Sequence, residues 1–120
     1  MTNMYPIRYN QGMEIEIEIY ETRTGKCPFL DWIEGLKEIH TRAKILTRLD
    51  RLKLGNFGDC KSIGGGIYEL RIHYGPGMRI YYSKIRRKIV LLLCGGNKGS
   101  QKKDIKNAQA FLEDYKAREV

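Results

Sequence analysis

The sequence has few of the residues that build metal sites or disulfide frameworks. It contains three cysteines, an odd number with no C-x-x-C spacing, and only two histidines. Neither a zinc site nor a disulfide framework is therefore indicated. We predict that the protein needs no metal or cofactor, that its cysteines are reduced, and that Cys94 is buried.

Long hydrophobic runs are absent as well. The first 12 residues lack the apolar core of a signal peptide, and the longest aliphatic run, IVLLLC from Ile89, is too short to cross a bilayer. We therefore expect a cytoplasmic protein without membrane contact. The chain has no repeat, linker or low-complexity tract, so residues 1–120 are expected to form one domain.

Acidic residues are outnumbered, and the excess of positive charge is uneven. The chain has 22 Lys and Arg against 14 Asp and Glu, a net charge of +8. Residues 1–21 hold one arginine and four glutamates, so the other 99 residues carry +11. A surplus of this size favours an anionic partner, either nucleic acid or an acidic protein, and charge alone does not distinguish them.

Apolar residues alternate near the N-terminus and then recur at helical spacing. MEIEIEIYE, residues 13–21, puts its apolar residues on one face and glutamates on the other, which predicts a strand with one wet face. Pro28 suits the first turn of a helix, and the helical pattern continues to Ile39. A short break is expected near His40 and Thr41.

A second helix is predicted after this break, ending at Gly55, which suits a C-terminal cap. Together the two helices indicate a helical hairpin. The second helix carries Lys44, Arg48 and Arg51 on one face, and we interpret this basic stripe as solvated in preference to a binding surface. Its buried stripe is expected to comprise Ile45 or Leu46, Leu49 and Leu52.

The second half of the chain reads as a small sheet and a closing helix. Residues 56–66 form a loop by composition, and strands are predicted at residues 67–74, 78–84 and 88–94. The last strand is apolar throughout, which is typical of a central strand covered on both faces. A helix with Ser100 as N-cap follows. The fold class is α+β: an N-terminal strand, a helical hairpin, a small antiparallel twisted sheet and a C-terminal helix.

Two arginines interrupt the predicted hairpin YELRIHYGPGMRIYY. Alternation must bury one face of both strands, and a three-residue loop over residues 75–77 satisfies this requirement. That register sets Arg71 opposite Tyr81 and His73 opposite Arg79, with all four side chains on one face. The face therefore gathers two guanidinium groups, an imidazole and a phenol.

Two interpretations of this face stay open. Glu69 lies on the same face, so the cluster is either a surface group in which it pairs with Arg71, or a site for a bound anion. Lysines also crowd the start of the last helix, where each opposes the helix dipole by about 0.3–1 kcal/mol unless it faces water or a phosphate binds there. These lysines are Lys98, Lys102, Lys103 and Lys106.

If both features contribute to one site, that site would suit the backbone of RNA or DNA. Cleavage of RNA by its own 2′-OH needs a base, donors for the charged transition state and an acid, and it does not require a metal. The arginines and lysines would stabilise charge. His73 or Tyr81 would transfer the proton.

The segments YELRIHYGPGMRIYY and VLLLCGGNKGSQKKDIKNA resemble the RelE/ParE superfamily of type II toxin–antitoxin toxins, in its phage Gp49-like, HigB-like branch of addiction module killer proteins. The resemblance extends from EIEIY through FLDWIEGL to the last helix. It implies a RelE-like fold and a helix-turn-helix antitoxin that neutralises the toxin and, in complex with it, represses operator DNA. For the ribonuclease members it also implies metal-independent cleavage of mRNA on the ribosome, which inhibits translation.

The resemblance also assigns roles to residues. Arg79 in GMRIYY matches the arginine that contacts the scissile phosphate, and Arg71 matches a basic position of the preceding strand. With His73 as the base, these residues form the expected catalytic set. The residues expected to bind RNA are Lys98, Lys102, Lys103 and Tyr81.

The chain departs from the family pattern at three places. Met78 stands where an aromatic residue is common, Asn97 where this branch often has Asp, and no Tyr or His follows the last strand until Tyr115. Ribonuclease members often use such a residue, whereas gyrase-poisoning members of the same fold lack one. On the shared arginine face and the family resemblance, the predicted function is an mRNA endoribonuclease. The alternatives are a non-catalytic gyrase poison and an attenuated toxin that acts mainly in a DNA-binding repressor complex.

Overall fold

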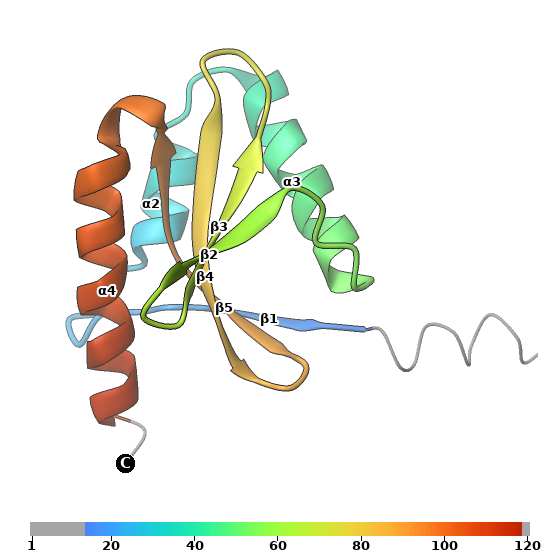
Figure 1. The fold of residues 1–120 in the computed structure, drawn as a ribbon. Helices are drawn as coiled ribbons and strands as arrows, with labels where there is room; N and C mark the ends of the chain where they lie inside the picture. Colours follow the sequence, from blue (N-terminus) through green and yellow to red (C-terminus); the bar gives the residue numbers. More distant parts are fainter. Residues whose placement is uncertain (1–13, 119–120) are drawn as a thin grey trace, which may run out of the picture.

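The computed structural model describes residues 14–118, in which helices flank a five-stranded sheet (Figure 1). The predicted α+β fold class is confirmed. Met13, where the first strand was expected to begin, lies outside the described residues. No helix in the described part of the chain is long and apolar enough to cross a membrane.

The sheet has the strand order β1-β5-β4-β3-β2. Strand β1 pairs in parallel with β5, and the other neighbours are antiparallel. The predicted antiparallel pairing of three strands is thus confirmed, a further antiparallel strand, β2, extends this sheet at one edge, and the N-terminal strand joins it at the other edge. The strands are β1 (Glu16–Ile19), β2 (Cys60–Gly64), β3 (Ile67–Ile72), β4 (Met78–Arg86) and β5 (Ile89–Asn97).

Strand β5 is covered on both faces, as its apolar run predicts. Val90 and Leu92 belong to the core beneath α2 (Pro28–Glu34) and α3 (Ile39–Lys53), whereas Leu91 and Leu93 belong to the core beneath α4 (Gln101–Arg118). Cys94 also lies in this second core, as predicted, and its burial raises the pKa of the thiol to about 12. All three cysteines are free.

Helices α2 (Pro28–Glu34) and α3 (Ile39–Lys53) lie on the same face of the sheet. Pro28 occupies the first turn of α2, as predicted. The predicted break near His40 and Thr41 is wrong, because both residues lie inside α3. The chain leaves the helix earlier, at Gly35, which caps the C-terminal end of α2.

The buried stripe and the end of α3 match the sequence pattern. Ile45, Leu49 and Leu52 are buried, whereas Leu46 is exposed, so the structure decides between the two candidates. Gly55 has a φ of +88°, a conformation that side-chain-bearing residues rarely adopt, and its N–H donates to the carbonyl of Leu52.

Helix α4 (Gln101–Arg118) covers the opposite face of the sheet (Figure 1). A 3-10 turn, η1 (Lys98–Ser100), precedes it, and the cap of this turn is Asn97. The prediction of Ser100 as the N-cap is therefore corrected. The helical path starts three residues earlier, because the Asn97 side chain accepts from the Ser100 N–H in a capping box.

The segment read as a loop, residues 56–66, contains the edge strand β2. It pairs antiparallel with β3 and has an irregularity between Ser62 and Gly64. This strand, CKSIG, has a single aliphatic residue, so it carries no alternating apolar signal. Pairing with β3, not local pattern, makes it a strand.

The β3–β4 hairpin has a longer loop than predicted. Arg71 pairs with Arg79 and Ile72 with Met78, so the predicted pairs of Arg71 with Tyr81 and of His73 with Arg79 are wrong. Residues 73–77 form the loop, with Gly75 and Gly77 at φ values of +57° and +87°. Because the register error is two residues, Arg71 and Arg79 still share one face.

Candidate functional site

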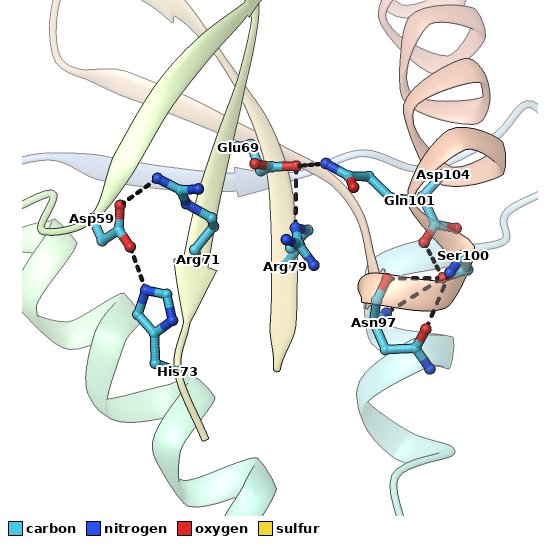
Figure 2. Close-up of polar contacts among 9 residues, drawn as sticks. All are labelled: Asp59, Glu69, Arg71, His73, Arg79, Asn97, Ser100, Gln101 and Asp104. Carbon is cyan, nitrogen blue, oxygen red and sulfur yellow. Dashed lines mark hydrogen bonds and ion pairs between the residues drawn. The ribbon is translucent and has the colours of Figure 1, made fainter. Parts of the chain in front are cut away.

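Two arginines face each other near the loop end of the β3–β4 hairpin. Arg71 and Arg79 are a directly opposed pair, and such residues have Cα atoms about 4.5–5.5 Å apart. Like charges in this arrangement destabilise a sheet. Each arginine instead has its own carboxylate: Asp59 for Arg71 and Glu69 for Arg79 (Figure 2).

The Glu69 carboxylate is buried beneath Arg79. Its side chain is 1% exposed and that of Arg79 is 14% exposed, and the Arg79 Nε lies 3.3 Å from Oε2 of Glu69. Gln101, at the start of α4, donates from Nε2 to the same oxygen at 2.8 Å. Because Nε faces Glu69, the terminal nitrogens of Arg79 lie on the far side of the guanidinium group, where they remain available to an anion (Figure 2).

Asp59 joins Arg71 to His73. It accepts from Nη2 of Arg71 at 3.0 Å, and its other oxygen lies 2.5 Å from Nε2 of His73 (Figure 2). The hydrogen bond from His73 is the main cause that holds the pKa of Asp59 below its usual value. The His73 side chain is 73% exposed, so this imidazole is oriented by a carboxylate and open to solvent.

The structure brings Arg71 and Arg79 together with His73 close by, but it separates Tyr81 from this group. Tyr81 shares the arginine face of β4, yet it is fully buried in the core under α4. Burial is the main cause that raises the pKa of its phenol, followed by the Glu69 charge. Tyr81 therefore has no exposed surface with which to contact RNA directly.

The expected RNA-binding lysines lie beyond Arg79, at the end of β5 and in the first turn of α4. Lys98, Lys102 and Lys103 are all exposed. These lysines oppose the dipole of α4, but a bound phosphate is not needed to offset this effect. Asp104 lies in the same first turn and accepts from the Ser100 hydroxyl at 2.5 Å, so the helix already has an anion at its N-terminus.

Sequence reasoning missed Asp59 and Gln101. Asp59 follows a loop with no periodic pattern, and only the pairing of β2 with β3 carries it to Arg71. The sequence analysis assigned no role to Gln101. A search for carboxylates able to neutralise two opposed arginines would have found Glu69, which the sequence analysis weighed only against Arg71.

No group of three metal-ligating side chains occurs within residues 14–118 that could hold a metal ion. The side chains gathered around the arginine pair carry guanidinium, imidazole and carboxylate groups, with lysines beyond them. Fixed donors of this kind suit an anionic ligand that develops further charge during a reaction.

The fold and this polar face define an α+β protein that presents an opposed arginine pair at one end of a twisted sheet. A protein-family model for phage-derived proteins of the Gp49-like type (DUF891) matches residues 27–116. The chain therefore belongs to the Gp49-like family, which is associated with toxin–antitoxin addiction modules. The match covers α2 to α4 and includes every site residue described above.

A relative from Haemophilus influenzae (strain ATCC 51907 / DSM 11121 / KW20 / Rd) is similar over most of its length. It is 46% identical over 86 residues, which span 72% of this chain and 87% of the relative. It is described only as an uncharacterized protein. The similarity supports the family and adds no activity.

Proposed function

We propose that this protein is the toxin of a type II toxin–antitoxin module in the RelE/ParE superfamily, and that it cleaves mRNA on the ribosome. The observation that carries the proposal is the opposed pair Arg71 and Arg79, each held by a carboxylate. Burial of the Glu69 carboxylate costs desolvation free energy. We infer that this carboxylate is kept because it holds the Arg79 guanidinium group in position for the substrate phosphate.

In the proposed reaction the RNA 2′-OH attacks the neighbouring phosphorus and the bond to the 5′ oxygen breaks, which leaves a 2′,3′-cyclic phosphate. The departing 5′ oxygen takes a proton from solvent. The terminal nitrogens of Arg79 donate to the non-bridging phosphate oxygens, whose charge grows in the transition state. Because Glu69 and Gln101 fix Arg79 before substrate arrives, little reorganisation is needed. Arg71 supplies a second positive charge on the adjacent strand.

His73 is the proposed base. Its Nε2 faces Asp59, so in the neutral imidazole the proton resides on Nε2 and the lone pair on Nδ1. Nδ1 can then accept the proton of the 2′-OH. Asp59 holds the ring and stabilises the imidazolium that forms, which makes Asp59 a positioning residue.

Lys98, Lys102 and Lys103 are proposed to bind the RNA backbone beside the arginines. We assign Tyr81 a packing role beneath the site instead of direct RNA binding, because the ring is buried. The proposed partner that neutralises the toxin is a cognate helix-turn-helix antitoxin, which in complex with the toxin would bind operator DNA.

The test is a primer-extension map of an mRNA incubated with the purified protein, with and without ribosomes. We expect cuts only in the presence of ribosomes, unchanged by a chelator of divalent metals added after translation complexes are assembled and fixed. An absence of cuts in both reactions would contradict the nuclease proposal.

One observation favours a gyrase poison as the second candidate. Tyr115, the first tyrosine or histidine after β5, donates to Glu18 of β1 at 3.3 Å, near the other end of α4. It therefore cannot serve the arginine pair. If no cuts appear on ribosomes, inhibition of supercoiling by purified gyrase at saturating protein would support this candidate. Normal growth during induction without antitoxin would instead indicate an attenuated toxin that acts in a repressor complex.

A further inference from the structure

A groove lies between α3 and the end of β3, on the side of the molecule away from α4. It encloses about 470 Å³, which is within the range of roughly 300–1,000 Å³ typical of small-ligand pockets. No acidic side chain lines it in the described part of the chain. Its polar lining is His40, Lys44, Thr47, Arg48, Arg51 and His73.

The cationic wall of the groove belongs to α3. His40, Lys44 and Arg51 are spaced by four and seven residues, which places them on one face of the helix, and all three are exposed. Lys44 and Arg51 belong to the basic stripe that we interpreted from sequence as solvated, and their exposure agrees with that interpretation. The third member of the stripe, Arg48, is partly buried.

Arg48 links the helix side of the groove to the strand side. Its guanidinium group donates to the carbonyl of Arg71 at 2.6 Å and to that of Phe57 at 3.0 Å. It therefore ties α3 to the backbone of β3, the strand that carries Arg71. Desolvation lowers the pKa of Arg48 from its ordinary value, which is the cost of placing a charge there. Lys44 and Arg51 remain as the exposed charges of the groove.

The groove adjoins the site through His73. This residue lines the groove and also contacts Asp59, the carboxylate that holds Arg71. His73 and Asp59 thus connect the groove to Arg71, which lies opposite Arg79 on the next strand (Figure 2). An RNA backbone that binds the arginine pair would therefore extend past His73 into the groove.

We propose that this groove binds the sugar–phosphate backbone of a single RNA strand, on one side of the phosphate held by the arginine pair. The proposal rests on the proposed function and adds a second contact tract to it. RNA is favoured over an acidic protein segment because the groove is continuous with the arginine site. Lys44 and Arg51 would each contact a phosphate and release counterions on binding.

The test measures affinity for a fluorescent single-stranded RNA of about twelve nucleotides, 2′-O-methylated so that it cannot be cleaved, across a range of salt concentrations. Compared with the wild type, the double variant Lys44→Ala/Arg51→Ala should bind more weakly. Its plot of log affinity against log salt should be shallower by about 1.4, since each lost single-strand phosphate contact removes about 0.7.

The matched control is Lys53→Ala/Lys61→Ala, which removes the same charge from two exposed positions outside the groove. It should keep the wild-type slope. A groove variant with wild-type affinity and slope, or a wild-type protein that does not bind this RNA at low salt, would overturn the proposal. Unchanged RNA binding together with lost antitoxin binding would identify an acidic protein as the occupant instead.

Binding and cleavage are separable in this design. If the ribosome-dependent nuclease proposal fails while the groove variant still loses RNA affinity, the groove remains an RNA-binding site. If cleavage by the wild type is confirmed while the groove variant binds RNA normally, only the groove proposal fails.

Discussion

Arg71 and Arg79 can be adjacent in a sheet because each is neutralised by a different carboxylate. Asp59, the partner of Arg71, is partly exposed, whereas Glu69, the partner of Arg79, is buried. An exposed pair contributes little to stability, but an unpaired buried charge is costly. The two arginines thus differ in kind: Arg79 is fixed by the interior of the protein, and Arg71 is held at its surface.

Replacement of Glu69 should therefore destabilise the protein strongly. Glu69→Ala leaves Arg79 without its buried partner, and we expect the free energy of unfolding to fall by about 3 kcal/mol, the lower end for breaking a buried pair. Urea denaturation measures this change. The exposed Glu113→Ala is the matched control and should change stability by less than about 0.5 kcal/mol.

A double-mutant cycle separates the pair from general loss of packing. Because Glu69→Ala and Arg79→Ala remove the same interaction, their combination should cost clearly less than the sum of the single changes. Additive effects would mean that the 3.3 Å contact contributes nothing to stability.

Stability should also decline in acid through Asp59. The pKa of Asp59 is lowered in the folded state, chiefly by the hydrogen bond from His73. The contribution of Asp59 to the free energy of unfolding is therefore fully present above the unfolded-state pKa of about 4. This contribution is lost as the pH falls through the folded-state pKa. We expect Asp59→Asn to lose less stability than the wild type between about pH 5 and pH 3, measured as the urea midpoint.

Asp50→Asn is the control for this prediction. Asp50 is an exposed carboxylate on α3 for which the described part of the chain shows no ion pair. Asp114, whose pKa is lowered chiefly by its hydrogen bond with Tyr20, keeps its share of the acid sensitivity in both variants. An Asp59→Asn profile parallel to that of the wild type would contradict the assignment.

At the scale of elements, the end of β5 is shaped by two glycines. A Cβ on Gly95 would collide with the ring of Trp32 from α2, and one on Gly96 would collide with the Asp104 carboxylate from α4. Because Gly95 and Gly96 have no side chains, the Trp32 ring and the Asp104 carboxylate can both lie close to the backbone of β5. The two glycines before the basic segment thus have a packing reason.

Gly95→Ala should overpack the contact with Trp32. We expect a loss of about 1–3 kcal/mol in the free energy of unfolding, together with a change in the emission of the single tryptophan. Gly35→Ala serves as the control, because its Cβ would lie at an ordinary 3.4 Å from the nearest atom. Unchanged stability and emission in Gly95→Ala would show that Trp32 does not pack on this strand as described.

Sequence reasoning predicted the elements with a strong apolar period and misplaced those without one. The stripe of α3 and the buried run of β5 were recognised, since many residues contribute to each pattern. Strand β2 carries no such pattern. The hairpin register was wrong by two residues, because alternation distinguishes the faces of a strand but not two registers that keep the same faces.

The candidate site was predicted to a similar extent. Arg71 and Arg79 were placed on one face correctly, because this depends only on alternation. The contacts of Asp59 and Gln101 depend on tertiary pairing, which a local pattern does not contain. Tyr81 was expected at the surface, but parity alone does not reveal that α4 covers its end of the face.

At the scale of the whole molecule, charge is arranged along one path. The sequence shows a surplus of +8, and the structure places part of it from the groove on α3, past the arginine pair, to the lysines before α4. Phosphate contacts of this kind position a strand without reading its sequence. The central claim is that Arg79, at the middle of this path, stabilises the transition state.

The most direct measurement is the single-turnover rate of cleavage of ribosome-bound mRNA by the wild type and by Arg79→Ala. Loss of one fixed donor to the developing charge should slow cleavage by about 100- to 1,000-fold. Arg87→Ala removes an exposed arginine from the turn between β4 and β5 and should cleave at the wild-type rate. Cleavage by Arg79→Ala at the wild-type rate would contradict the account.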